Sequence, residues 1–136
     1  MAGCGESEGV ASGAVVSVYV VSPLCAEAQR ELAHEGGRAG DVRVRSICLP
    51  SAEGKTLDLA TIGANARRAT EDSTTIGYIG EPTFAATRFS ARILEAAGIA
   101  QLSQTSGAAA MTKLLHAVAE AGDSGSLRES VHDELE

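Results

Sequence analysis

Hydroxyl and carboxyl side chains recur just after the predicted strands of this 136-residue chain. They are Ser22, Glu81, Thr83, Ser103, Thr105 and Ser106. Such groups can donate and accept hydrogen bonds to a small polar ligand, and helix N-termini beside them can hold an anion. Serine and threonine are also the usual caps at helix starts. We weigh this cap interpretation ahead of ligand binding.

Two cysteines form the next candidate pair. Cys25 opens the helix predicted after the first strand, and Cys48 ends the second strand. Because these strands are predicted to be neighbours, both residues lie at the same edge, within bridging range. A disulfide suits an exported protein, and two buried thiols are the alternative. No CxxC pair or paired histidine accompanies them, so we predict no metal site and no cofactor.

Two short motifs invite catalytic interpretations that their surroundings do not support. Gly54-Lys55-Thr56 matches the last three residues of a phosphate-binding loop motif. That motif also requires a glycine five residues before Gly54, and this position is Leu49. Gly122-Asp123-Ser124-Gly125 resembles a serine-protease nucleophile loop, but the chain lacks an ordered His/Asp pair. We therefore predict that the protein is not an enzyme.

Composition excludes several classes of partner. The net charge of −7 argues against nucleic acid or an anionic membrane surface. Aromatic residues make up 3% of the chain, which argues against sugar or base stacking. No run of eighteen apolar residues is present, so no membrane span is predicted.

The apolar runs and helix-period segments alternate as β-α-β-α-β-α-β-α-α across one domain, residues 14–136, after a flexible leader at 1–13. Strands are expected at 14–21, 42–49, 76–80 and just before Ser103, with 42–49 at an edge. Helices are expected at 25–34 and 58–71, between Pro82 and Gly98, from Gly107 onward, and in a short final segment. The expected buried stripes are Leu59, Ile62, Ala66 and Ala69; Ala86, Phe89, Ile93 and Ala97; Met111, Leu114, Leu115 and Val118; and Leu127, Val131 and Leu135. Right-handed crossovers favour a parallel sheet of order 2-1-3-4.

Several segments together carry a resemblance to a known family. They are VVSVYVVSPL at 15–24, YIGE at 78–81, ILEAAGI at 93–99 and QLSQTSG at 101–107. Their order and spacing resemble the first lobe of the type I periplasmic solute-binding proteins, the branched-chain amino acid receptors of ABC importers. The likeness covers most of residues 14–107. The tail LLHAVAEAGDSGSLRESVHDEL resembles the returning carboxyl-terminal helices of that family, whereas a generic helical hairpin on an unrelated α/β domain is the alternative.

The resemblance implies a three-layer α/β/α single lobe with a four-stranded parallel sheet, from which the second lobe is missing. It implies an extracytoplasmic module that binds or senses an amino-acid-type ligand, and it leaves open an association with transport. Ala86 and Gly107 stand where many members have ligand-binding hydroxyl groups, so two of them are lost. An interaction or scaffold protein without a small ligand is therefore the alternative. The strand-end face, covered by the second lobe in relatives, is expected to recruit a second copy or another protein.

The chain opens with Ala2-Gly3-Cys4, followed by a Gly/Ser/Glu-rich stretch. This start resembles the end of a bacterial lipoprotein signal, in which Cys4 would carry the lipid. The apolar stretch that precedes such a site is absent, and a chance cysteine in a small-residue leader is the alternative. On the first interpretation the protein lies in the cell envelope and touches the membrane only through its tether.

Overall fold

The computed structural model describes residues 15–50, 58–103, 105–121 and 127–135. Strands and helices alternate over most of this length. In chain order they are β1 (Val15–Val21), α1 (Cys25–His34), β2 (Arg38–Ala39), β3 (Val42–Leu49), α2 (Leu59–Glu71), β4 (Thr75–Ile79), α3 (Phe84–Ala96), β5 (Ala100–Leu102), α4 (Gly107–Ala121) and α5 (Leu127–Leu135). The predicted α/β class is confirmed.

The sheet has five strands in the order β2-β3-β1-β4-β5. The ladders β3–β1, β1–β4 and β4–β5 are parallel, and Tyr19 on β1 pairs with Tyr78 on β4. Strand β2 runs antiparallel to β3. The prediction of a four-stranded, purely parallel sheet is therefore wrong, because the sheet is five-stranded and mixed.

The missed strand β2 belongs to a tight hairpin with β3. Ala39 pairs with Val42, so Gly40 and Asp41 alone form the turn, and Gly40 has a φ of 60°. Glycine adopts this left-handed conformation without a steric cost, which is why Gly-Asp is a two-residue hairpin signal. Since β2 pairs with Val42 and Arg43, the prediction that residues 42–49 form an edge strand is wrong for the start of β3.

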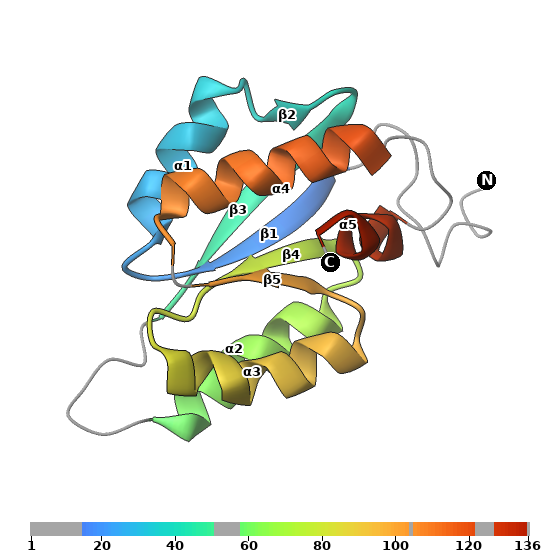
Figure 1. The fold of residues 1–136 in the computed structure, drawn as a ribbon. Helices are drawn as coiled ribbons and strands as arrows, with labels where there is room; N and C mark the ends of the chain where they lie inside the picture. The colour runs from blue at the N-terminus through green and yellow to red at the C-terminus, as the bar shows by residue number, and fades with distance from the viewer. Residues whose placement is uncertain (1–14, 51–57, 104, 122–126, 136) are drawn as a thin grey trace.

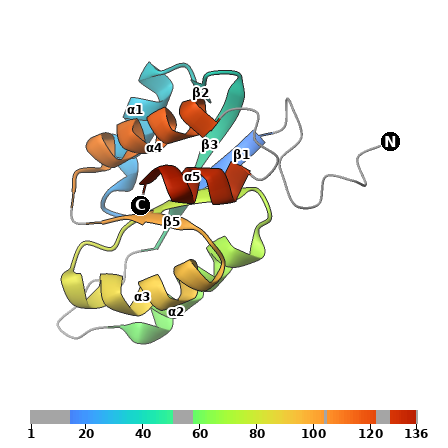
Figure 2. The same ribbon diagram turned by 45° about the vertical axis from the view of Figure 1, so that its right-hand side comes forward.

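Two helical layers enclose the sheet (Figures 1 and 2). Helices α1, α4 and α5 cover one face, and α2 and α3 lie side by side on the other. Strand β1 divides its side chains between them, as a strand does with a period of two. Val16, Val18 and Val20 enter the core beneath α1, α4 and α5, whereas Tyr19 and Val21 enter the core beneath α2 and α3.

The predicted buried face was correct for all of α4 and for most of α2 and α5. All four residues of the predicted α4 stripe are buried, namely Met111, Leu114, Leu115 and Val118. In α2, Ile62, Ala66 and Ala69 are buried but Leu59 is 44% exposed, so that assignment is wrong. In α5, Leu127 and Val131 are buried and Leu135 is half-buried.

Helix α3 buries only part of the expected stripe, because Ala86 is buried as predicted but two other residues take the remaining core positions. Ala86, Ser90 and Leu94 are buried, whereas Phe89, Ile93 and Ala97 are only half-buried. Ser90 can be buried because Gln101 Nε2 donates a hydrogen bond of 2.8 Å to its Oγ. A satisfied hydroxyl group costs little to bury, so this polar residue takes a core position.

Helices α1 and α4 approach each other at Gly107, the first residue of α4. A Cβ atom there would lie far inside van der Waals contact of the Leu24 carbonyl oxygen and 3.1 Å from the Ala28 nitrogen. Glu27 Oε1 accepts a hydrogen bond of 3.0 Å from the Gly107 N–H. This close crossing positions the start of α4, and it requires a residue without a side chain.

Helix α5 is held against the sheet by Arg128 as well as by Leu127 and Val131. The Arg128 guanidinium donates to the carbonyl oxygens of Thr75 and Asp72, both at 2.8 Å. The Asp72 carboxylate in turn accepts a hydrogen bond of 2.7 Å from the Tyr19 hydroxyl group. The last helix is thereby attached to the amino-terminal end of β4. None of the helices in the described ranges is both long and apolar enough to cross a membrane.

Candidate functional site at the strand ends

The residues predicted to bind a ligand all follow the carboxyl ends of parallel strands. Ser22 follows β1, Glu81 and Thr83 follow β4, and Ser103, Thr105 and Ser106 follow β5. Since β1, β4 and β5 are parallel neighbours, these residues come to the same edge of the sheet. In open α/β sheets this edge is where ligands bind. We call it the strand-end face.

Glu81 is at this edge but does not present its carboxyl group to solvent. The residue is 1% exposed, and its Oε2 accepts a hydrogen bond of 2.8 Å from the Tyr78 hydroxyl group. Burial raises the pKa of Glu81 above its usual value, although the Tyr78 hydrogen bond opposes the shift. Burial also raises the pKa of Tyr78. The pair forms an internal polar contact beneath α3.

The Glu81 carboxyl group gives a testable pH dependence of stability. In the unfolded chain it ionises near its ordinary value of 4.5, whereas the folded protein retains the proton to higher pH. Its contribution to stability is therefore full below pH 4.5 and is lost as the pH rises through the folded pKa. We expect Glu81→Gln, measured by urea unfolding between pH 4.5 and 8.5, to gain stability relative to the wild type as the pH rises.

The matched control for this experiment is Glu129→Gln, which removes one negative charge from an exposed glutamate on α5. Its stability difference from the wild type should not grow with pH in the same way. A difference between Glu81→Gln and the wild type that is constant over the range would show that Glu81 has the same pKa in both states.

Two of the predicted ligand-binding hydroxyl groups cap helices. Thr83 Oγ1 accepts a hydrogen bond of 3.2 Å from the Ala86 N–H at the start of α3. Ser106 Oγ accepts one of 3.0 Å from the Ala109 N–H at the start of α4. Each cap satisfies a backbone donor that the helix itself leaves without a partner. Both side chains therefore have a structural role that does not depend on a ligand.

The remaining predicted residues differ in exposure. Ser22 and Ser103 are half-buried, and Thr105 is exposed. The backbone N–H of Ser22 donates to the Leu49 carbonyl oxygen at 2.9 Å, which closes the sheet at this edge. Ser106 lines a groove of about 470 Å³ beside α1, whose walls include Glu27, Arg30, Glu31 and His34. The candidate hydroxyl groups thus come from both helical layers along the strand-end face.

Sequence reasoning missed the two large apolar side chains that are exposed in the described residues. Phe84 is 65% exposed and Leu59 is 44% exposed. They are the first residues of α3 and α2, which lie side by side and both start at the strand-end face (Figure 1). The Arg88 guanidinium lies over the Phe84 ring, 5.8 Å from its centroid. The available signal was that Phe84 falls outside the apolar stripe of its own helix.

The structure joins the two candidate cysteines in a disulfide. Cys25 is the first residue of α1, Cys48 is near the end of β3, and their Cα atoms lie 5.8 Å apart. Cys48 is exposed, so the pair does not match the alternative of two buried thiols.

Other predictions fall outside the described residues. Among these are the lipidation site Cys4, the Gly54-Lys55-Thr56 segment and the Gly122–Gly125 segment. Within the part of the chain that is described, no cluster of three or more His, Cys, Asp or Glu side chains could hold a metal ion. The chain matches no protein-family model, no curated protein and no solved structure.

Proposed function

We propose that this protein is an extracytoplasmic binding module built as one lobe of a type I solute-binding-protein-like fold, with its strand-end face as the working surface. A second copy of the chain completes this face, and an amino-acid-type ligand is the proposed small molecule. The observation that carries the proposal is the exposure of Phe84 and Leu59 at this one edge. Both are large apolar side chains at the starts of neighbouring helices, and interaction surfaces expose side chains of this kind.

A closed dimer is the simplest partner arrangement for such a face. A two-fold contact uses the same patch on both copies, so each exposed phenylalanine can pack on the partner's surface without open-ended growth. Aromatic and arginine side chains are enriched at the centres of interfaces, and the Phe84–Arg88 stack offers both.

Sedimentation at rising protein concentration tests the dimer. We expect the wild type to associate, and Phe84→Ser and Leu59→Ser each to weaken the dimer by about tenfold or more in Kd, because each removes an apolar contact from the interface centre. The control is Ala119→Ser on α4, an exposed position in the opposite helical layer. A strict monomer at high concentration would argue against the proposed surface.

The ligand part of the proposal rests on the resemblance and on a helix start at the strand-end face. The N-terminus of α3 supplies backbone N–H groups and a positive dipole end, which suit a carboxylate. At the start of α4 the Glu27 carboxylate already accepts a hydrogen bond from the Gly107 N–H. A thermal-shift screen against the common amino acids tests it, because a ligand that binds only the folded state raises the midpoint with concentration. Reproducible stabilisation by one amino acid is the expected result.

A ligand-free interaction module is the second candidate. It is favoured by the hydrogen bonds that occupy the predicted ligand groups: Glu81 bonds with Tyr78, and the Thr83 and Ser106 hydroxyl groups cap helices. If the protein is a ligand-free interaction module, the dimer forms and Phe84→Ser weakens it, while no amino acid changes the melting temperature. The two experiments together therefore separate the candidates.

The proposed location is the cell envelope, with a lipid tether at Cys4. The Cys25–Cys48 disulfide supports it, since such bonds persist in oxidising compartments. Mass spectrometry of the protein purified from its source cells would test lipidation of Cys4.

A further inference from the structure

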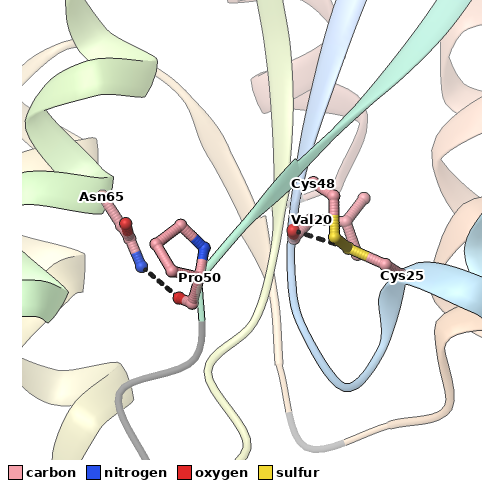
Figure 3. Close-up of a disulfide and its surroundings, with 5 residues drawn as sticks. All are labelled: Val20, Cys25, Cys48, Pro50 and Asn65. Atoms are coloured by element: carbon pink, nitrogen blue, oxygen red, sulfur yellow. Dashed lines mark hydrogen bonds between the residues drawn. A yellow bond between two sulfur atoms is a disulfide. The ribbon is translucent and has the colours of Figure 1, made fainter.

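The two cysteines of the disulfide differ in their exposure to solvent. Cys25 is 8% exposed at the start of α1, whereas Cys48 is exposed on β3. Figure 3 shows the bond between the end of β3 and the beginning of α1. A thiolate approaching from solvent therefore meets Cys48 more readily than Cys25. In thiol–disulfide exchange the attacked sulfur is set by such access.

The end of β3 has attachments that do not depend on the disulfide. Asn65, a residue of α2, is 4% exposed and donates a hydrogen bond of 2.9 Å to the Pro50 carbonyl oxygen (Figure 3). Val20 and Cys48 are partners in the parallel β1–β3 ladder. Cleaving the disulfide removes the covalent link to α1, but the strand stays held by its neighbour β1 and by α2.

After reduction, the Cys25 thiol would have a hydrogen-bond acceptor close by. Cys25 Sγ lies 3.1 Å from the Val20 carbonyl oxygen. In the disulfide this sulfur carries no hydrogen, whereas as a thiol it can donate a weak hydrogen bond to that oxygen. The leaving sulfur also sits at the N-terminus of α1, where the helix dipole favours negative charge as the bond breaks. Both oxidation states are thus compatible with one fold.

We propose that Cys25–Cys48 is a thiol–disulfide exchange site that reacts in the folded protein, with Cys48 as the attacked sulfur. An external thiolate, from a small thiol or a dithiol protein, forms a new S–S bond to Cys48 Sγ. The Cys48–Cys25 bond breaks, and its electron pair leaves with Cys25, which takes a proton from water. A second thiolate then releases reduced Cys48. Two electrons pass to the protein, and the external thiols are oxidised to a disulfide.

The first test measures reduction of the intact protein in a Cys4→Ser background, which leaves the disulfide pair as its only cysteines. Dithiothreitol at rising concentration is the reductant, and alkylation with mass spectrometry counts the free thiols. Direct attack on the folded protein predicts a rate that stays proportional to dithiothreitol concentration, with an unchanged far-UV spectrum afterwards. A rate that reaches a plateau at the global unfolding rate, or reduction that unfolds the chain, would overturn the proposal.

The second test compares single-cysteine variants with oxidised glutathione as the probe, at one pH and with folding checked by circular dichroism. In the same Cys4→Ser background, Cys25→Ser leaves only exposed Cys48, and Cys48→Ser leaves only buried Cys25. We expect the mixed disulfide to form about tenfold faster or more on Cys48, since reactivity follows access. Equal rates, or a faster reaction of Cys25, contradict the assignment of Cys48. If one variant fails to fold, the first test alone decides, and neither test depends on the dimer or the ligand.

Discussion

Gly107→Ala is expected to lower the free energy of unfolding by about 3 kcal/mol, the upper part of the usual range for overpacking. The new Cβ atom would overlap the Leu24 carbonyl oxygen, and the Ala28 nitrogen would lie 3.1 Å away. Both are backbone atoms of the α1 start, so no side-chain rotation can relieve the overlap. Helix α4 must shift, which disturbs the hydrogen bond from Gly107 to Glu27. Chemical denaturation measures the loss.

The matched control is Gly63→Ala in the middle of α2. Its Cβ atom would meet the far end of the Arg67 side chain at 3.1 Å and the Phe89 ring at 3.5 Å. The arginine can move, and alanine is better than glycine inside a helix by up to about 1 kcal/mol. We therefore expect a neutral or stabilising effect. Equal losses at both positions would show that the α1–α4 crossing is not as tight as the structure has it.

Arg128→Met is expected to cost about 2–4 kcal/mol, because two hydrogen bonds from a charged group are lost together. The carbonyl oxygens of Thr75 and Asp72 lose their guanidinium partner, while methionine retains much of the apolar stem. Native-state hydrogen exchange should show the effect first in α5, whose amides are expected to open more readily than those of the central strands.

Arg92→Met serves as the comparison for this variant. Arg92 is an exposed arginine on α3, so its replacement should change stability by no more than about 0.5 kcal/mol. Should Arg128→Met behave like Arg92→Met, the packing of Leu127 and Val131 alone would hold α5 on the sheet.

Much of the architecture was readable from periodicity. The β-branched run 14–21 and the helix-period segments predicted the order of the main elements, because apolar burial determines both patterns. Strand β2 was missed since its two residues, Arg38 and Ala39, are too short to show a period. The Gly40-Asp41 dipeptide, which is typical of a two-residue hairpin turn, is the feature of the sequence that could have located this strand.

The candidate site was predictable in position and less so in chemistry. Parallel strands place their carboxyl ends at one edge, so the location of Ser22, Thr83 and Ser106 followed from the fold alone. Which groups face solvent there depends on pairings between distant segments. Glu81 turns inward because Tyr78 bonds with it, and no periodicity reveals such a pair. Phe84 was not singled out either, although its place outside the apolar stripe of α3 favours exposure.

The borders of the sheet are short. One border strand, β2, has two residues, and the other, β5, has three. A long unpaired border is a template on which further strands add and fibrils grow. These two strands themselves offer little length for that kind of growth, although β2 pairs with only Val42 and Arg43 of the eight residues in β3. On the proposed function, side-chain contacts at the starts of α2 and α3 are then the route to association, and such contacts favour small closed assemblies over fibrils.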